Sequence, residues 1–169
     1  MRIAIVDDLE TERAQLKTRL ARQLRLCGTE AQLLEFESGE SFLAAEKEQR
    51  FTAAFLDIYM NGLSGMDAAR ELRKTDADCL LVFTTTSTDH ALEGFQVRAF
   101  HYLVKPFSEE ELSALLEDGV LAAGLDKLYA ESGWLWAQCA THRTLCAENF
   151  ARSMPDVPLK AIVNAPAHT

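Results

Sequence analysis

The sequence predicts an α/β protein built on a doubly wound, five-stranded parallel sheet with strand order 2-1-3-4-5. Five short apolar runs alternate, over residues 1–123, with five segments whose apolar residues recur at helical spacing. The connections are short, so each strand is expected to reach the next by a right-handed crossover, with helices on both faces of one sheet. A barrel fragment would show the same alternation, but five units are too few to close an eight-stranded barrel.

Each predicted strand is a short apolar run that contains β-branched or aromatic residues. The five runs are Arg2–Val6, Ala31–Phe36, Thr52–Leu56, Cys79–Thr84 and Phe100–Val104. The third is followed by Asp57 and then by the turn dipeptides Asn61-Gly62 and Ser64-Gly65. Near-continuous apolar runs of this length are typical of parallel strands that are buried on both faces.

The predicted helices follow the strands one by one. In the first, leucines recur at helical spacing from Leu9 to Leu24, and Cys27-Gly28 provides a natural stop. The other four are expected from Ser38 onward, over Met66–Lys74, over Asp89–Gln96 and after Ser108. Ser108 is a good helix cap, and the three glutamates that follow it suit the positive N-terminus of a helix.

The composition is that of a globular domain with an appendage. The 169 residues are 48% hydrophobic and 25% charged, and the net charge of -9 is a poor match for a protein whose whole surface grips nucleic acid. We expect a domain over residues 1–123 and a short extension over 124–169. No apolar run approaches the ~20 residues of a membrane span, and "MRIAIVDD" turns acidic too early for a signal peptide. A cytoplasmic location without membrane contact is therefore expected.

The four cysteines indicate reduced thiols. Cys27 falls at a predicted helix end and Cys79 at a predicted strand start, and the chain has no CxxC pair. The alternative is a metal site at Cys139, His142 and Cys146, although no fourth ligand is apparent.

Polar residues follow four of the predicted strands at their carboxyl ends. Asp7 and Asp8 follow the first strand, Asp57 the third and Lys105 the fifth, and the hydroxyl residues Thr84–Thr86 lie at the end of the fourth. These four strands are neighbours in the order 2-1-3-4-5, and sites in such sheets lie beyond the carboxyl ends of the strands. We expect three carboxylates, a hydroxyl and an ammonium to converge there.

This set of groups points to phosphoryl chemistry. Three neighbouring acids repel one another, and a hard divalent cation such as Mg²⁺ relieves the repulsion. A rigidly held carboxylate, Asp57, is expected to attack a phosphoryl group, while the Lys105 ammonium and the Thr85 hydroxyl stabilise its oxygens. Taken singly, each residue has an ordinary alternative: Asp57 as a turn former, Asp8 as a helix cap and Lys105 as a solvated lysine. Their coincidence at the ends of adjacent strands favours a site.

Four stretches carry a family resemblance: "IAIVDD" (3–8), "FLDIYMNGLSGMDAARELR" (55–73), "LVFTTTSTDHALEGF" (81–95) and "FHYLVKPF" (100–107). Together they resemble the receiver domain of two-component response regulators, of the kind attached to LytTR-type DNA-binding domains. The resemblance covers residues 1–123 and implies the flavodoxin-like form of the predicted sheet. It also implies a phosphoprotein that works in a phosphorelay with a sensor histidine kinase. Such a protein is not an enzyme, apart from family-type self-phosphorylation and autodephosphorylation.

The resemblance also implies a role for each site residue. Asp57 looks like the phosphoacceptor, and Thr85 and Lys105 match its catalytic partners. Thr85, which the spacing to "DHALEGF" favours over Thr84 and Thr86, is also the switch hydroxyl. Tyr102 matches the aromatic residue that turns inward with it, or simply packs on its strand. The ligands of Mg²⁺ implied by the family are Asp7, Asp8, Asp57 and the main-chain carbonyl of Tyr59.

Two positions near Asp57 set this chain apart. The family often has Pro where this chain has Asn61, and Asn61-Gly62 is expected to form the turn unaided. Tyr59 and Ser87 occupy positions that tune phosphate lifetime in the family, and a bulky Tyr59 is expected to shield the phosphoryl group from water. Phosphorylation is expected to change the face formed by the fourth helix, fifth strand and fifth helix, which is a possible homodimer or output surface.

The extension has a different character from the rest. From Asp126 onward four acidic and four basic residues balance, and Leu121, Leu125 and Leu128 are expected to extend the last helix. "FARSMPD" (150–156) has a weak likeness to LytTR domains, so a truncated or degenerate output domain is expected, with a disordered extension as the alternative. The chain would then act in transcription regulation, and the alternative function is a LytTR-type regulator whose tail still contacts DNA.

Two further functions fit the same sheet. A flavodoxin-like cofactor binder would need a Ser-, Thr- or Gly-rich phosphate cradle after the first strand, but this chain has Asp7-Asp8-Leu9-Glu10 there, which repels phosphate unless a cation intervenes. A hydrolase that works through an aspartyl-phosphate would need a cap or substrate pocket, and residues 1–123 contain no insertion large enough to form one.

Overall fold

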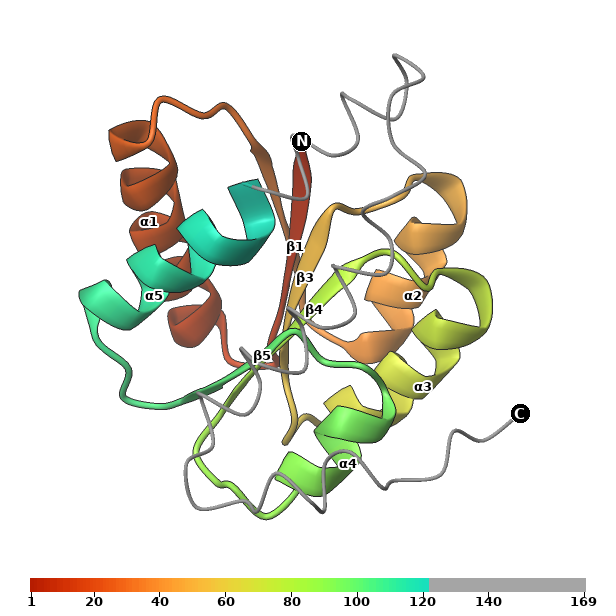
Figure 1. Cartoon of the computed structure of the whole chain (residues 1–169). Helices are drawn as coiled ribbons and strands as arrows, with labels where there is room; N and C mark the ends of the chain where they lie inside the picture. Colours follow the sequence, from red (N-terminus) through yellow and green to blue (C-terminus); the bar gives the residue numbers. More distant parts are fainter. Residues whose placement is uncertain (122–169) are drawn as a thin grey trace, which may run out of the picture.

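The computed structural model describes residues 1–121, which form a five-stranded, all-parallel sheet in the order β2-β1-β3-β4-β5 (Figure 1). The strands are β1 (Arg2–Val6), β2 (Gln32–Phe36), β3 (Ala53–Asp57), β4 (Leu80–Thr85) and β5 (His101–Val104). The predicted fold class and strand order are confirmed, and each strand boundary lies within one residue of its expected position. The shift that matters is in β3, because Asp57 is its last residue rather than the first residue of the loop.

Helices cover both faces of the sheet (Figure 1). They are α1 (Glu10–Leu26), α2 (Gly39–Glu48), α3 (Gly65–Thr75), α4 (Ala91–Gln96) and α5 (Glu109–Leu115), and α5 continues into a π-helix, η1 (Leu116–Leu121). Figure 1 shows α1 and α5 on one face and α2, α3 and α4 on the other. Leu125, Leu128, the extension and the residues Cys139, His142 and Cys146 lie outside the described residues.

Alternate residues of the buried strands point to opposite faces of the sheet and form two hydrophobic cores, one on each face. The core beneath α1 and α5 includes Ile3, Ile5, Phe55, Val82 and Phe100. The core beneath α2, α3 and α4 includes Ala4, Val6, Leu56, Phe83 and Tyr102. Because both faces are covered, β3 and β4 are buried along their whole length, and their carboxyl ends have little freedom to move.

Local signals in the sequence set the helix boundaries. The Ser38 and Ser64 hydroxyls each accept a hydrogen bond from the backbone of the first turn of α2 and α3. Ser108 and Glu111 form a reciprocal capping box at the start of α5, which confirms Ser108 as the predicted cap. Gly28, with φ of 65°, follows the Cys27 cap at the end of α1 and takes a left-handed conformation that suits glycine.

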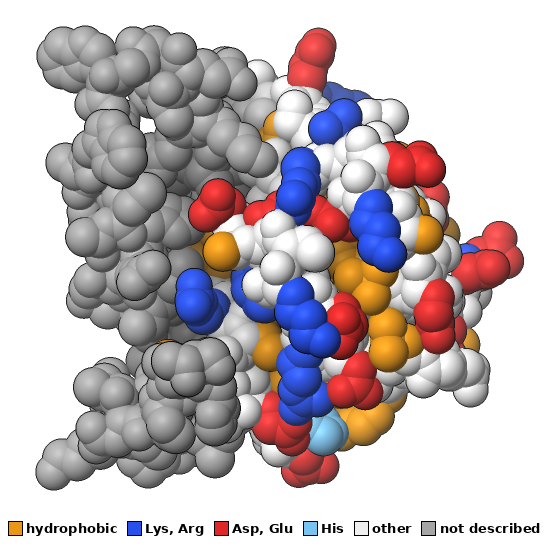
Figure 2. Space-filling model, turned by 90° about the vertical axis from the view of Figure 1, so that its right-hand side faces the viewer, with side chains coloured by type: hydrophobic (Ala, Val, Ile, Leu, Met, Phe, Trp, Pro, Cys, Tyr) orange, Lys and Arg blue, Asp and Glu red, His pale blue; other side chains and the backbone are white. Residues whose placement is uncertain are grey.

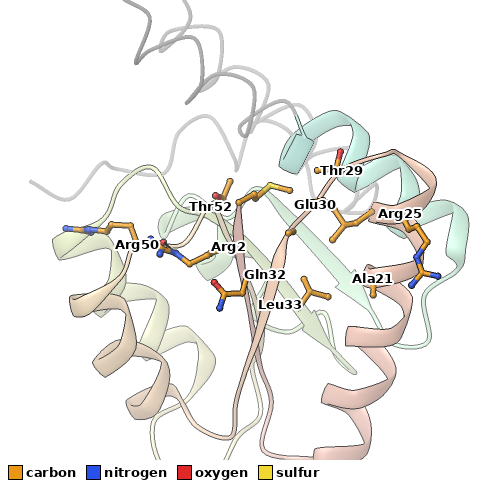
Figure 3. A pocket seen from close by; sticks show the side chains of 12 residues that line it. Arg2, Ala21, Arg25, Thr29, Glu30, Gln32, Leu33, Arg50 and Thr52 are labelled. Carbon is orange, nitrogen blue, oxygen red and sulfur yellow. Dashed lines mark hydrogen bonds between the residues drawn. The ribbon is translucent and has the colours of Figure 1, made fainter.

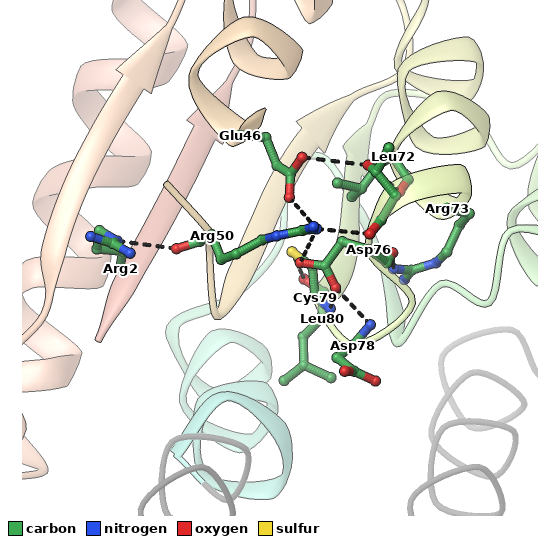
Figure 4. Close-up of polar contacts among 10 residues, drawn as sticks. Arg2, Glu46, Arg50, Leu72, Arg73, Asp76, Asp78, Cys79 and Leu80 are labelled. Atoms are coloured by element: carbon green, nitrogen blue, oxygen red, sulfur yellow. Dashed lines mark hydrogen bonds and ion pairs between the residues drawn. The ribbon is translucent and has the colours of Figure 1, made fainter. Parts of the chain in front are cut away.

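A polar network around Arg50 lies at the edge of the sheet opposite the carboxyl ends (Figure 4). The Arg50 guanidinium contacts Glu46 at 2.8 Å, Asp76 at 3.3 Å and the Thr75 carbonyl at 2.9 Å, and Arg2 donates to the Arg50 carbonyl. Glu46 and Asp76 are both buried, and Arg50 gives each of these two acids a positively charged partner. The network joins the C-terminal ends of α2 and α3 and so holds these two helices together on one face of the sheet.

An open cavity of about 930 Å³ lies at this same edge, between the end of α1 and the starts of β1 and β2 (Figure 3). Its lining includes Arg2, Arg25, Gln32 and Thr52. The cavity is therefore at the opposite end of the strands from the predicted site. Of the helices described, none is long and apolar enough to cross a membrane.

Candidate functional site

Two carboxylates lie side by side at the carboxyl edge of the sheet. Asp7 directly follows β1 and Asp57 ends β3, and these strands pair in register through Val6 and Leu56. Asp7 is 4% exposed and Asp57 is 7% exposed. Acidic side chains are rarely this buried unless they are paired, so a compensating cation is required.

The ammonium of Lys105 is that cation. It lies 2.7 Å from Asp7 Oδ2, 3.4 Å from Asp57 Oδ1 and 3.5 Å from Glu12 Oε2. The Lys105 backbone donates to the Thr85 carbonyl at 2.7 Å, which holds the residue beside the end of β4. With its side chain only 18% exposed, Lys105 is not the solvated lysine of the ordinary alternative, and that interpretation is wrong.

Electrostatics differ for the two partners of this contact. Burial lowers the pKa of Lys105, but the hydrogen bond to Asp7 and the charges of Asp57, Asp7 and Glu12 outweigh burial, so its pKa is raised. Burial raises the pKa of Asp57 to about 6, helped by Asp7 and opposed by Lys105 and the Tyr59 backbone. A more basic carboxylate is a better nucleophile once ionised, which suits Asp57 for attack.

Asp8 makes contacts that the sequence did not reveal. Its Oδ2 accepts hydrogen bonds from the Asn61 backbone at 3.1 Å and from Asn61 Nδ2 at 2.7 Å. The alternative role as a helix cap is wrong, because α1 starts after Leu9 without a side-chain cap and Leu9 donates to Asp7 instead. The signal missed was the amide of Asn61, which had been interpreted only as a turn former.

The end of β4 supplies a buried hydroxyl. Thr85 is the last residue of β4 and fully buried, whereas Thr86 is exposed. The Ser87 backbone donates to Thr85 Oγ1 at 3.5 Å, and the Tyr102 hydroxyl donates to the Ser87 carbonyl at 2.8 Å. Ser87 therefore connects the two residues predicted to act as a switch.

Tyr102 is held inside the molecule as a hydrogen-bond donor. It is buried against Phe83, at 5.9 Å between ring centroids. Burial and then the charges of Tyr59, Asp89 and other nearby groups raise the pKa of Tyr102, so its hydroxyl stays protonated. Tyr59, by contrast, is 48% exposed and packs edge-on against His90 at 5.7 Å.

The donor types at this edge fit Mg²⁺. Asp7, Asp8 and Asp57 provide the hard oxygen ligands that the ion prefers, and the Tyr59 carbonyl lies on the adjoining loop. Within residues 1–121 no three His, Cys, Asp or Glu side chains are gathered into a ready metal-binding group. In the arrangement described, Lys105 takes the charge-balancing role at Asp7 and Asp57.

This fold and this edge define a class of protein: an open α/β domain that presents buried acids, a lysine and a hydroxyl at the carboxyl ends of its strands. The chain belongs to the response regulator receiver family, because the family model described as the response regulator receiver domain matches residues 3–117. It is therefore the receiver domain of a two-component response regulator, a class of signalling domains rather than classic enzymes. The resemblance found in the motifs is confirmed.

Curated relatives place the chain among regulatory proteins. The sensory transduction protein LytT of Bacillus subtilis (strain 168) is 34% identical over 117 residues, which cover 69% of this chain and 47% of LytT. The positive alginate biosynthesis regulatory protein of Pseudomonas aeruginosa is 36% identical over 69% of this chain and 46% of its own length. The chain thus spans about half the length of the curated relatives it matches.

Solved structures share the fold. The response regulatory domain of protein mrkE from Klebsiella pneumoniae aligns with a TM-score of 0.67 and 25% identity, covering 74% of this chain and 99% of that one. The response regulator TrrA from Thermotoga maritima, solved in complex with Mg²⁺-BeF, aligns with a TM-score of 0.60 and 29% identity, covering 69% and 96%. The cofactor-binder and hydrolase alternatives are not favoured by these relatives.

Proposed function

We propose that this receiver domain accepts a phosphoryl group on Asp57 from a sensor histidine kinase, with Mg²⁺ as cofactor. The observation that carries the proposal is the contact of one half-buried lysine, Lys105, with two buried acids, Asp7 and Asp57. In the unphosphorylated protein Lys105 balances the negative charge of the two acids. Its ammonium is also close enough to Asp57 to stabilise the negative charge of an added phosphoryl group.

Each residue has one step in the proposed transfer. An Asp57 carboxylate oxygen forms a bond to phosphorus while the bond from phosphorus to the kinase histidine nitrogen breaks, and that nitrogen keeps the electron pair. Lys105 stabilises the phosphoryl oxygens, and the Thr85 hydroxyl donates to one of them. Asp7, Asp8, Asp57 and the Tyr59 carbonyl would hold Mg²⁺, which when bound offsets the negative charge of the phosphoryl group.

The proposed switch uses the contacts around Ser87. Phosphorylation adds close to two negative charges and strong acceptors beside Thr85. A Thr85 hydroxyl that turns toward these acceptors gives up its contact with the Ser87 backbone, and the Ser87 carbonyl is the acceptor for Tyr102. The change would spread to α4 and β5, and this face is the proposed homodimer or output surface. Chromatography with and without a beryllofluoride mimic measures that dimerisation.

The chemistry is tested by mass. The wild-type chain and Asp57→Asn are incubated with acetyl phosphate and Mg²⁺, and intact mass is recorded with and without a chelator. Only the wild type with Mg²⁺ is expected to gain the mass of one phosphoryl group. A mass gain of equal size in Asp57→Asn would show that a residue other than Asp57 accepts the phosphoryl group.

We further propose that the domain acts in transcription regulation inside the cell, as names such as the transcriptional regulatory protein YpdB of Escherichia coli suggest for relatives. The alternative, in which the tail of this chain contacts DNA itself, is not favoured, because the family match covers the receiver residues 3–117. A DNA-binding assay with a salt titration separates the two.

A further inference from the structure

The loop between β3 and α3 is tied at two points to acids on other elements. At the first, both the backbone N–H and the Nδ2 of Asn61 donate to Asp8, which follows β1. At the second, the Leu63 backbone donates to Glu40 Oε1 at 2.9 Å, in the first turn of α2. Gly62, with φ of 79°, lies between the two points and lets the chain turn there.

The two donors of Asn61 act on one oxygen of Asp8. Both hydrogen bonds end at Oδ2, at 3.1 Å from the backbone and 2.7 Å from the side chain. Two donors on one oxygen fix the rotation of the carboxylate. Both of these hydrogen bonds use Oδ2 of Asp8, and neither uses Oδ1. Asp8 is only half-buried, and the hydrogen bonds named here leave Oδ1 for another partner.

Asn61 also connects two proposed ligands that come from different strands. Asp8 follows β1, whereas the carbonyl of Tyr59 belongs to the same loop as Asn61, two residues earlier. The Asn61 to Asp8 contact bridges 53 positions of sequence and holds this loop against the end of β1. Residues that orient ligands in this way typically change metal affinity about 10- to 100-fold when they are removed.

A proline at this position would supply neither donor, because it lacks both an N–H and a side-chain amide. The residue at position 61 therefore does more here than form a turn. We propose that Asn61 is a positioning residue of the proposed magnesium site: it fixes the Asp8 carboxylate through Oδ2 and holds the loop that carries the Tyr59 carbonyl against the end of β1, so that both groups would be available to the ion. This inference rests on the proposed function.

The test measures Mg²⁺ affinity rather than phosphorylation. Isothermal titration of the full chain with MgCl₂ is expected to give an affinity about tenfold weaker for Asn61→Ala than for wild type. Glu40→Ala is the matched control, since it frees the same loop at Leu63 without touching Asp8, and it is expected to keep at least a third of the wild-type affinity, in line with a role outside the ligand set. Melting without Mg²⁺ checks that both variants fold.

A double-mutant cycle separates positioning from general loop order. On an Asp8→Asn background, Asn61→Ala is expected to lower Mg²⁺ affinity by less than about twofold, because the ligand it orients is already altered. Equal losses in Glu40→Ala and Asn61→Ala, or an undiminished loss on the Asp8→Asn background, would overturn the inference. If wild type binds Mg²⁺ and Asn61→Ala binds it with the same affinity, this inference alone is wrong. If wild type does not bind Mg²⁺, the proposed function is wrong as well.

Discussion

Asp57 is a carboxyl group whose environment is changed strongly by the fold. Burial at the end of β3 raises its pKa to about 6, although Lys105 opposes the rise. Keeping this buried carboxylate ionised costs free energy, because its charged form has lost contact with water, so protonation or a nearby positive charge is favourable. Because its pKa differs between the folded and unfolded states, Asp57 is expected to make the stability of the protein depend on pH.

Without metal, Asp57→Asn should stabilise the protein more at high pH than at low pH. The folded carboxyl holds its proton up to about pH 6, whereas the unfolded one loses it near 3.8, so the unfolding free energy of wild type falls as pH rises through this window. Asn does not titrate. The stability of Asp57→Asn relative to wild type should increase by about 2 kcal/mol from pH 4.5 to pH 7.5.

Urea denaturation in the presence of a chelator, at both pH values, measures this difference. Titrating groups away from the site are common to the two proteins and cancel, whereas Asp7 and Lys105 interact with Asp57 and belong to the measured difference. A difference that stays the same at the two pH values would show that Asp57 is not strained by burial.

At the scale of elements, the start of α3 sets the position of the acidic strand end. A Cβ added to Gly65 would lie 2.0 Å from the Asp57 carbonyl oxygen, and the Gly65 backbone donates to the Ile58 carbonyl at 3.1 Å. The helix can approach the end of β3 this closely only because position 65 has no side chain. The same helix holds α4 through its arginines.

Gly65→Ala should destabilise the protein by about 2 kcal/mol or more, because the clash is with backbone that cannot yield. Gly39→Ala is the matched control: its Cβ would meet Ala68 and Leu63 at 3.1 to 3.2 Å, a tight contact that small shifts relieve. Thermal and urea unfolding measure both. A smaller loss in Gly65→Ala than in Gly39→Ala would contradict the packing.

Arg73 fastens α3 to the turn between α4 and β5. It donates to the carbonyls of Val97 at 2.7 Å, Arg98 at 3.2 Å and Asp76 at 3.0 Å. Arg98 has a φ of 53°, unusual for a residue other than glycine, so this turn needs support. Arg73→Ala should lower the unfolding free energy by about 2 kcal/mol, because the substitution removes a charged donor and leaves the carbonyls that it served without this partner.

The matched change is Lys74→Ala, one residue along α3. Lys74 pairs with Glu71 at 2.6 Å, and both side chains are exposed. Figure 2 shows acidic and basic side chains interspersed on the side of the molecule that it presents. Exposed pairs of this kind contribute about 0 to 1 kcal/mol, so Lys74→Ala should have little effect. Equal losses in the two variants would mean that Arg73 acts as an ordinary surface charge.

At the scale of the whole molecule, the predictable features were those with local signals. The apolar runs predicted the strands, Ser38 and Ser108 predicted the starts of α2 and α5, and placement after a strand brought Asp7, Asp57 and Lys105 together. The contacts of Asn61 with Asp8, of Glu12 with Lys105 and of Arg73 with the turn after α4 depend on loop paths between distant segments, which no local pattern encodes. The roles of the site residues and the domain boundary stay predictions.

That boundary is testable by truncation, because η1, the last element described, contributes to the core beneath α1 and α5. Leu116 in η1 is fully buried, and Gly119 lies so close to Phe100 that an added Cβ would be 2.2 Å from its ring. A chain ending at residue 123 keeps these contacts, and should unfold cooperatively with a free energy within about 1 kcal/mol of the full chain. A chain ending at residue 115 exposes Phe100 and should lose about 3 kcal/mol or more. Urea unfolding compares the three; a chain ending at 123 that fails to fold would mean that the receiver needs residues beyond its predicted boundary.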